Sequence, residues 1–179
     1  MNFKHTIKKR QKGFTLIELL IVIVILGLLT TIGLGSFLSS QRKGRDARRK
    51  ADLDGITTAL ELYYNDYDQY PLSDGAGNIV GCDGSACSWN QIWESAGTIY
   101  MVQIPDDPRG ASYRYSSNGT GYVLYARLEN DQDQDIPAGP SGAGIYTGES
   151  CLSGGCNYAT FSSNTNPSSL PAVVDDPLF

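Results

Sequence analysis

Few residues in this sequence could do acid–base or nucleophilic chemistry. His5 is the only histidine, and it lies in the basic N-terminal stretch. If that stretch is removed, histidine-based triads and histidine zinc sites are excluded from the rest of the chain. The carboxylate pair Asp106 and Asp107 lies between two prolines, a pattern that predicts a rigid turn. We therefore expect a protein that is not an enzyme.

A second candidate for chemistry is a run of alternating acids at Asp131, Asp133 and Asp135. Carboxylate oxygens at this spacing are typical ligands of calcium. The run does not match an EF-hand loop, because Ile136 stands where the glycine should be and Gly142 where the glutamate should be. The residues themselves leave two interpretations open, a calcium site and a solvated acidic loop.

The four cysteines form two pairs with four residues inside each, Cys82 with Cys87 and Cys151 with Cys156. Zinc sites more often use a spacing of two residues, and an exported domain favours disulfides over free thiols. Four cysteines allow three connectivities. The sequence does not choose among them, although the local pairs Cys82–Cys87 and Cys151–Cys156 are the least demanding.

The charges are divided unevenly along the 179 residues, a length suited to one domain. Residues 1–50 carry 11 basic and 2 acidic side chains, and residues 51–179 carry 3 basic and 17 acidic ones. Nucleic-acid binding needs clustered Lys and Arg, so an acidic domain argues against that partner. The basic residues from Arg42 to Lys50 are most simply a solvated helix face with partners four residues on, such as Arg48–Asp52 and Lys50–Asp54. Pairing with acidic domains of neighbouring subunits and DNA capture are the other interpretations.

An apolar run covers residues 14–38, and Glu18 is its only charged residue. As a helix of 25 residues it would measure roughly 37 Å, enough to cross a membrane. The alternative is a secretory signal peptide cleaved before Ser36, since Gly33 and Gly35 form a small-x-small pattern. Positive charges flank the run on both sides, so charge alone does not orient it.

The segment Gly13-Phe14-Thr15-Leu16-Ile17-Glu18-Leu19-Leu20 resembles the GFTLIELL signature of type IV pilins and type II secretion pseudopilins. The resemblance implies that a prepilin peptidase cleaves after Gly13, that Phe14 is N-methylated and that Glu18 acts in assembly. The segment Ile104–Tyr115 resembles the P-x-D-P-x-G-x-x-Y-x-Y segment of major pseudopilins. Those proteins have a calcium site in the loop after this part of the sheet, so the resemblance implies that the acidic run is the corresponding loop.

The expected fold is α+β: a pilin fold in which a long N-terminal helix packs on a small antiparallel sheet with disulfide-bearing loops. The amphipathic half of the helix should run from Ser39 to about Asn65 and stop before Pro71. Residues 72–100 look loop-like, with a short helix over Asn90–Ala96. A hairpin turn at Ser117–Gly121 should lead into a strand over Tyr122–Leu128. The expected divisions are a leader (1–13), a transmembrane or fibre-core helix (14–38), the amphipathic half (39–68), a globular head (69–161) and a flexible tail (162–179).

The resemblance implies a structural subunit, processed by prepilin peptidase and held as a single-pass protein in the inner membrane with its head outside the cytoplasm. An assembly platform and ATPase would then move it from lipid into a helical fibre of identical subunits, at the cell surface or in the periplasm. The type IV pilus and the type II secretion pseudopilus both remain open. The alternative is a membrane-anchored or secreted binding protein that uses the apolar segment only as an anchor or signal peptide.

Overall fold

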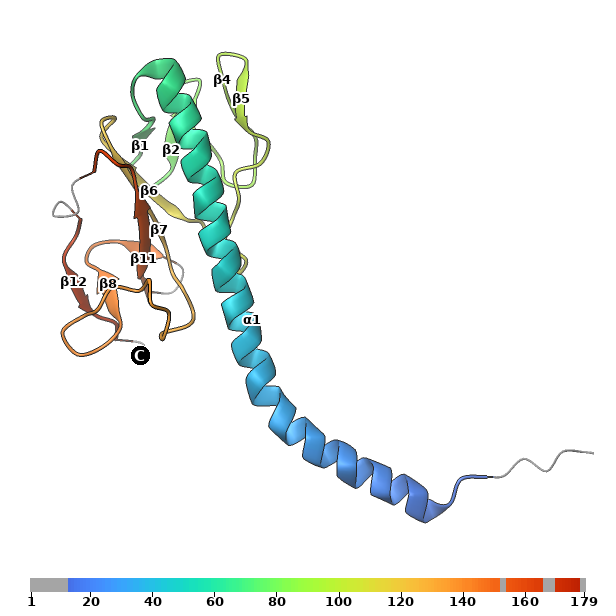
Figure 1. The fold of residues 1–179 in the computed structure, drawn as a ribbon. Coiled ribbons are helices and arrows are strands. Elements are labelled where there is room, and N and C mark those ends of the chain that lie inside the picture. The colour runs from blue at the N-terminus through green and yellow to red at the C-terminus, as the bar shows by residue number, and fades with distance from the viewer. Residues whose placement is uncertain (1–12, 152–153, 166–169, 178–179) are drawn as a thin grey trace, which may run out of the picture. The chain divides into compact units, whose positions relative to one another are not determined.

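The computed structural model describes residues 13–151, 154–165 and 170–177 (Figure 1). The chain divides into two compact units, one ending at Ser40 and one beginning at Gln41. The helix α1 (Leu16–Tyr67) supplies all the regular structure of the first unit and continues into the second. Of the expected leader, residues 1–12 lie outside the described part of the chain.

In the first unit, α1 is apolar around its whole circumference. Every large apolar side chain from Leu16 to Leu29 is at least 51% exposed. Within the described residues, no single helix is both long and apolar enough for a membrane span, although the segments Leu16–Thr31 and Gly35–Tyr67 together could cross one by length and composition. Among the described residues, the large apolar side chains of this half of α1 are therefore left uncovered.

In the second unit, α1 buries one face against the head. Leu53, Ile56 and Leu60 follow one another at three- and four-residue steps and are completely buried. They pack in a core whose other members include Trp93 and Leu124. The helix thus has the amphipathic stripe that its sequence predicts, and it ends at Tyr67, two residues later than expected.

The described part of the head contains twelve short strands. They are β1 (Leu72–Ser73), β2 (Ile79–Cys82), β3 (Ser85–Ala86), β4 (Trp93–Ser95), β5 (Thr98–Met101), β6 (Arg114–Ser117), β7 (Tyr122–Ala126), β8 (Gly144–Tyr146), β9 (Ser150–Cys151), β10 (Gly154–Gly155), β11 (Tyr158–Phe161) and β12 (Val173–Asp175). The fold class is α+β, a pilin-like helix on small antiparallel sheets, as expected.

The sheet that carries α1 has the order β11-β7-β6 and is antiparallel throughout. The turn between β6 and β7 forms the expected hairpin, in which Ser117 pairs with Tyr122. All five residues of β7 are buried, because alternate side chains enter two different cores. Leu124 lies in the core with α1, whereas Tyr125 lies in a second core with Tyr146 and the disulfide of Cys151. Figure 1 shows β8 and β12 on the side of this sheet away from α1.

Three expectations about local structure are corrected. Residues 72–100 hold five short strands and are not simply loops, because β1, β2 and β3 pair with one another and β4 pairs with β5. No helix forms over Asn90–Ala96, where Trp93 is fully buried on β4. The expected flexible tail contains β12, which pairs with β8, so the ordered head extends beyond residue 161. Residues 166–169 and 178–179 of that tail lie outside the described part.

Both disulfides are local. Cys82 is bonded to Cys87 in the β2–β3 hairpin, and Cys151 is bonded to Cys156 across the β9–β10 hairpin. At least one cysteine of each disulfide is shielded from solvent, since Cys87, Cys151 and Cys156 are buried. Each bridge closes a loop of only a few residues, which limits the chain entropy that it removes from the unfolded state.

We expect all four cysteines to be oxidised in the exported protein. Thiol labelling without reductant should find no free cysteine, and peptide mapping should recover Cys82 with Cys87 and Cys151 with Cys156. Because the loops are short, reducing either bridge should lower the free energy of unfolding by only about 2 kcal/mol. Stoichiometric zinc in the purified protein, or a peptide that joins Cys82 to Cys151, would contradict this assignment.

Candidate functional site

The helix begins with a reciprocal pair of side-chain hydrogen bonds. The backbone N–H of Thr15 and its hydroxyl donate to Glu18 Oε2 at 2.8 and 2.7 Å, and the N–H of Glu18 donates to Thr15 Oγ1 at 3.3 Å. This is a capping box, which satisfies two of the backbone donors left free at a helix start. The sequence signal for it, a threonine three residues before a glutamate at the start of an apolar run, was overlooked in the sequence analysis. In this chain, Glu18 therefore has a local partner next to the expected cleavage site.

The two residues at that cleavage site are accessible. Phe14 is 89% exposed, and Gly13 precedes the helix in non-helical backbone. A Cβ atom added at Gly13 would meet no atom of the described chain within 4 Å. The described fold itself therefore does not require glycine at position 13.

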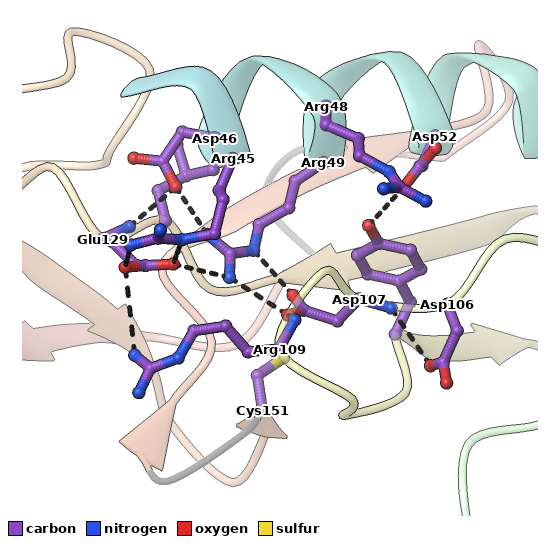
Figure 2. Close-up of polar contacts among 12 residues, drawn as sticks. Arg45, Asp46, Arg48, Arg49, Asp52, Asp106, Asp107, Arg109, Glu129 and Cys151 are labelled. Carbon is purple, nitrogen blue, oxygen red and sulfur yellow. Dashed lines mark hydrogen bonds and ion pairs between the residues drawn. The ribbon is translucent and has the colours of Figure 1, made fainter. Parts of the chain in front are cut away.

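In the second unit, the polar centre is Arg49, whose side chain on α1 is completely buried (Figure 2). Its Nε and Nη2 donate to the two carboxylate oxygens of Asp107 at 2.6 and 3.0 Å. Its Nη1 donates to Asp46 Oδ1 at 2.7 Å, and Nη2 lies 2.9 Å from Glu129 Oε1. Burial opposes the charge and lowers the pKa of Arg49, but the hydrogen bonds and charges of these carboxylates outweigh it, so the pKa is raised. Arg49 is therefore a permanently charged group enclosed by three acids.

Glu129 receives a second arginine from α1. Arg45 donates from Nε to Oε1 at 2.8 Å and from Nη2 to Oε2 at 2.5 Å, a bidentate pair. Arg109 Nη1 lies 3.8 Å from Oε2. The hydrogen bonds from Arg45 lower the pKa of Glu129 most, burial works against them, and Arg49 adds to them, which leaves the pKa at about 2. Glu129 is ionised throughout the physiological pH range.

Asp46 joins the cluster to the backbone of the segment after β7. Its Oδ1 accepts from the N–H of Glu129 and its Oδ2 from the N–H of Asn130, both at 2.9 Å. Asp46 is 2% exposed, and its two oxygens thus satisfy backbone donors as well as Arg49. We call the set Arg45, Asp46, Arg49, Asp107 and Glu129 the ion cluster.

The proline-bounded segment after residue 104 presents Asp107 to α1. The N–H of Gly110 donates to the carbonyl of Asp107 at 2.8 Å, and Gly110 has a φ of 77°, which glycine adopts without strain. The N–H of Arg109 donates to Asp107 Oδ1 at 2.8 Å, while Asp106 Oδ1 accepts from the N–H of Asp107. The rigid turn expected from the sequence is present, and its role is to hold one carboxylate against Arg49.

The ion cluster corrects the interpretation of the basic residues 42–50 as a solvated helix face. Arg45, Arg49 and Lys50 bind acids of the head, and only Arg48 makes the expected contact four residues on, 3.8 Å from Asp52. The expected Lys50–Asp54 pair gives way to contacts with the loop after β7. Periodicity along one helix suggested partners four residues away. The head acids that Arg45, Arg49 and Lys50 contact are instead 58 to 85 residues away along the chain.

The three alternating acids do not converge on one point as the ligands of a metal ion would. Asp133 and Asp135 both face the ammonium of Lys50, and Asp131 is exposed. Throughout residues 13–151, 154–165 and 170–177, no three acidic, histidine or cysteine side chains are placed to hold one metal ion. The residues present therefore do not fit calcium as they are arranged, and no step of the function is derived through it.

Comparison with known proteins adds to this geometry. Residues 8–34 match the prokaryotic N-terminal methylation motif, and residues 36–134 match the type II secretion system protein G family. The chain belongs to the type II secretion system protein G family. The family match begins just before the amphipathic half of α1 and ends inside the acidic run, so it contains every residue of the ion cluster.

Several curated type II secretion system core protein G chains are similar to this member of the protein G family. The protein of Aeromonas hydrophila is 30% identical over 63% of this chain and 77% of its own length. That of Pseudomonas aeruginosa is 30% identical over 63% and 78%, and that of Escherichia coli 27% identical over 74% and 84%. No solved structure matches the chain significantly. A protein G chain with this motif is a pseudopilin, a structural subunit, and membership implies an inner-membrane anchor and a head outside the cytoplasm.

Proposed function

We propose that this chain is cleaved between Gly13 and Phe14, anchored by its apolar helix and then assembled into the pseudopilus of a type II secretion system. The observation that carries the proposal is one continuous α1 whose start bears the methylation motif and whose second half bears the protein G head. The motif would serve processing, the apolar segment would serve anchoring, and the apolar segment and head together would serve assembly.

The exposed apolar side chains of α1 support the assembly step. A helix that is apolar all round is stable only among lipid tails or among other apolar helices. In the described chain, every large apolar side chain from Leu16 to Leu29 is more than half exposed. Lipid and neighbouring copies are the two apolar environments available to these side chains. The exchange of lipid for identical helices needs no refolding of the head, because the head has cores of its own.

The second support is Glu18, the single carboxylate of the apolar segment. Cleavage would create an ammonium at Phe14, one helical turn away. A carboxylate in hydrocarbon is costly, and pairing with a cation reduces that cost. The capping box shows how Glu18 is satisfied within one chain, and the Phe14 ammonium of a neighbour offers a charged partner in its place.

Processing is tested directly on the membrane fraction. Intact mass and N-terminal sequencing should show a chain that starts at methylated Phe14. Gly13→Val should leave the precursor uncleaved and the fold unchanged, because a side chain at this position meets no atom of the described chain. A mature chain that starts at Ser36 would instead identify an ordinary signal peptide.

The system is tested by deleting the gene and measuring which proteins reach the medium. Loss of secreted enzymes, restored by the wild-type chain and not by the uncleaved Gly13→Val chain, is the result expected of a secretion pseudopilin. Unchanged secretion together with a loss of surface pili would assign the chain to a type IV pilus. A binding protein that is merely anchored is not favoured by the family, and it would leave both properties intact.

A further inference from the structure

Lys50 lies between two of the three alternating acids. Its Nζ donates to Asp133 Oδ1 at 2.7 Å and to Asp135 Oδ2 at 2.6 Å, and it lies 5.6 Å from the ring centre of Tyr158 on β11. The Lys50 side chain is 25% exposed and that of Asp133 is 20% exposed, so this contact is partly shielded from water. One cation from α1 thus meets two carboxylates of the loop after β7.

The loop also closes on itself around Asp133. Its Oδ1, which accepts from Lys50, accepts as well from the N–H of Asp135 at 3.0 Å. The N–H of Asp133 donates to the carbonyl of Asn130, and the N–H of Ile136 donates to the carbonyl of Asp133. Ile136 is buried at the end of this turn. The backbone of the turn therefore holds the Asp133 carboxylate in place, and the Lys50 ammonium joins it to that of Asp135.

Lys50 and Asp133 each hold the charged form of the other. Burial lowers the pKa of Lys50, but the hydrogen bonds and charges of Asp133 and Asp135 outweigh it and raise the pKa. Burial raises the pKa of Asp133, but the hydrogen bond and charge of Lys50 and the hydrogen bond from the N–H of Asp135 together outweigh it, so that the pKa is lowered. One ammonium and two carboxylates leave one net negative charge. Without the ammonium the two carboxylates would carry two negative charges, which a divalent cation would neutralise.

We propose that the Lys50 ammonium fills the position of a divalent cation at this loop, so that the loop is closed onto α1 without any metal. The inference concerns the head alone and does not depend on cleavage, secretion or fibre assembly. Lys50 would then do for Asp133 and Asp135 what calcium would do in the interpretation of Asp131, Asp133 and Asp135 as a metal site. It also implies that a neutral residue at position 50 would turn the loop into a calcium site.

The test compares thermal unfolding in chelator and in millimolar calcium, using the full chain in detergent and the fluorescence of Trp89 and Trp93. The melting temperature of the wild type should be the same in both conditions. Lys50→Gln should melt several degrees lower in chelator, because two carboxylates then face each other, and calcium should restore most of this loss. Lys43→Gln, an exposed position on the same helix, is the matched control and should respond to neither change.

Three results would overturn the proposal. The first is a wild-type chain that calcium stabilises with Lys50 in place. The second is a Lys50→Gln variant that in chelator is as stable as Lys43→Gln. The third is a Lys50→Gln variant that loses stability and gains nothing from calcium, which would make the contact an ordinary ion pair.

Discussion

Replacing Glu18 by alanine should abolish fibre formation or leave very few fibres, while the processed subunit accumulates in the membrane. Insertion should be at least as efficient as in the wild type, since the change removes a carboxylate from an apolar segment. What is lost is the partner for the Phe14 ammonium of the next subunit, about 3–5 kcal/mol for an unpaired charge in an apolar interior. The measurement is the ratio of sheared fibre to membrane-bound chain on immunoblots, with electron microscopy of the fibres.

Two variants separate pairing from helix capping. Glu18→Asp keeps the charge with a shorter reach and should give an intermediate number of fibres. Thr15→Ala removes the hydroxyl of the capping box but keeps the Glu18 carboxylate, so it should cost fewer fibres than Glu18→Ala. Fibres of normal number from Glu18→Ala would show that the charge pair is not needed, and equal losses in Glu18→Ala and Thr15→Ala would assign the role of Glu18 to the cap.

Replacing Arg49 by methionine should destabilise the head by about 3–5 kcal/mol, because buried carboxylates of Asp46, Asp107 and Glu129 would lose their shared cation. Methionine keeps the length and the helix propensity of the position, so the effect reports the charge. The free energy of unfolding is measured with denaturant, by the fluorescence of the two tryptophans. Arg48→Met is the matched control: that side chain is 64% exposed and its pair with Asp52 is long, so the cost should stay below about 1 kcal/mol.

The difference in the free energy of unfolding between the wild type and Arg49→Met should depend on pH. Glu129 has its pKa lowered from 4.5 to about 2 in the folded wild type, so its contribution to stability is present above pH 4.5 and lost as the pH falls toward 2. In Arg49→Met, Glu129 keeps its pair with Arg45 and loses the one with Arg49, so its pKa should be lowered less than in the wild type. The gap in stability between the wild type and Arg49→Met should therefore narrow across this window, and a gap that is constant with pH would attribute the loss to packing.

The parts of the fold that the sequence predicts are the ones specified by neighbours along the chain. The helix up to Tyr67 follows from the spacing of Leu53, Ile56 and Leu60, and the β6–β7 hairpin follows from Asn118-Gly119 between alternating residues. The methylation motif is likewise a contiguous string of residues. The strands over residues 72–100 were missed because each is two to four residues long, too short for any period to show.

The ion cluster was missed for a different reason. Arg49 looks like the other basic residues around it, and nothing local indicates that it alone faces Asp107, 58 residues further on. The turn around Asp107 was predicted from its prolines, but which acid it presents, and to what, depends on the tertiary fold. The acidic run was interpreted as a calcium site or a solvated loop, and in the structure two of its carboxylates bind the ammonium of Lys50, a side chain from another element.

The order of strands in the main sheet governs when the head can fold. β7 lies between β6, which precedes it by one turn, and β11, which begins more than thirty residues later. Glu129 follows Arg45 by 84 residues and Asp107 follows Arg49 by 58 residues, so these ion pairs can form only after the chain has been synthesised beyond residue 129. Contacts between such distant parts of a sequence form slowly, since a long loop must close first. Until β11 is present β7 has an open edge, so closure of this sheet comes late in the folding of the head.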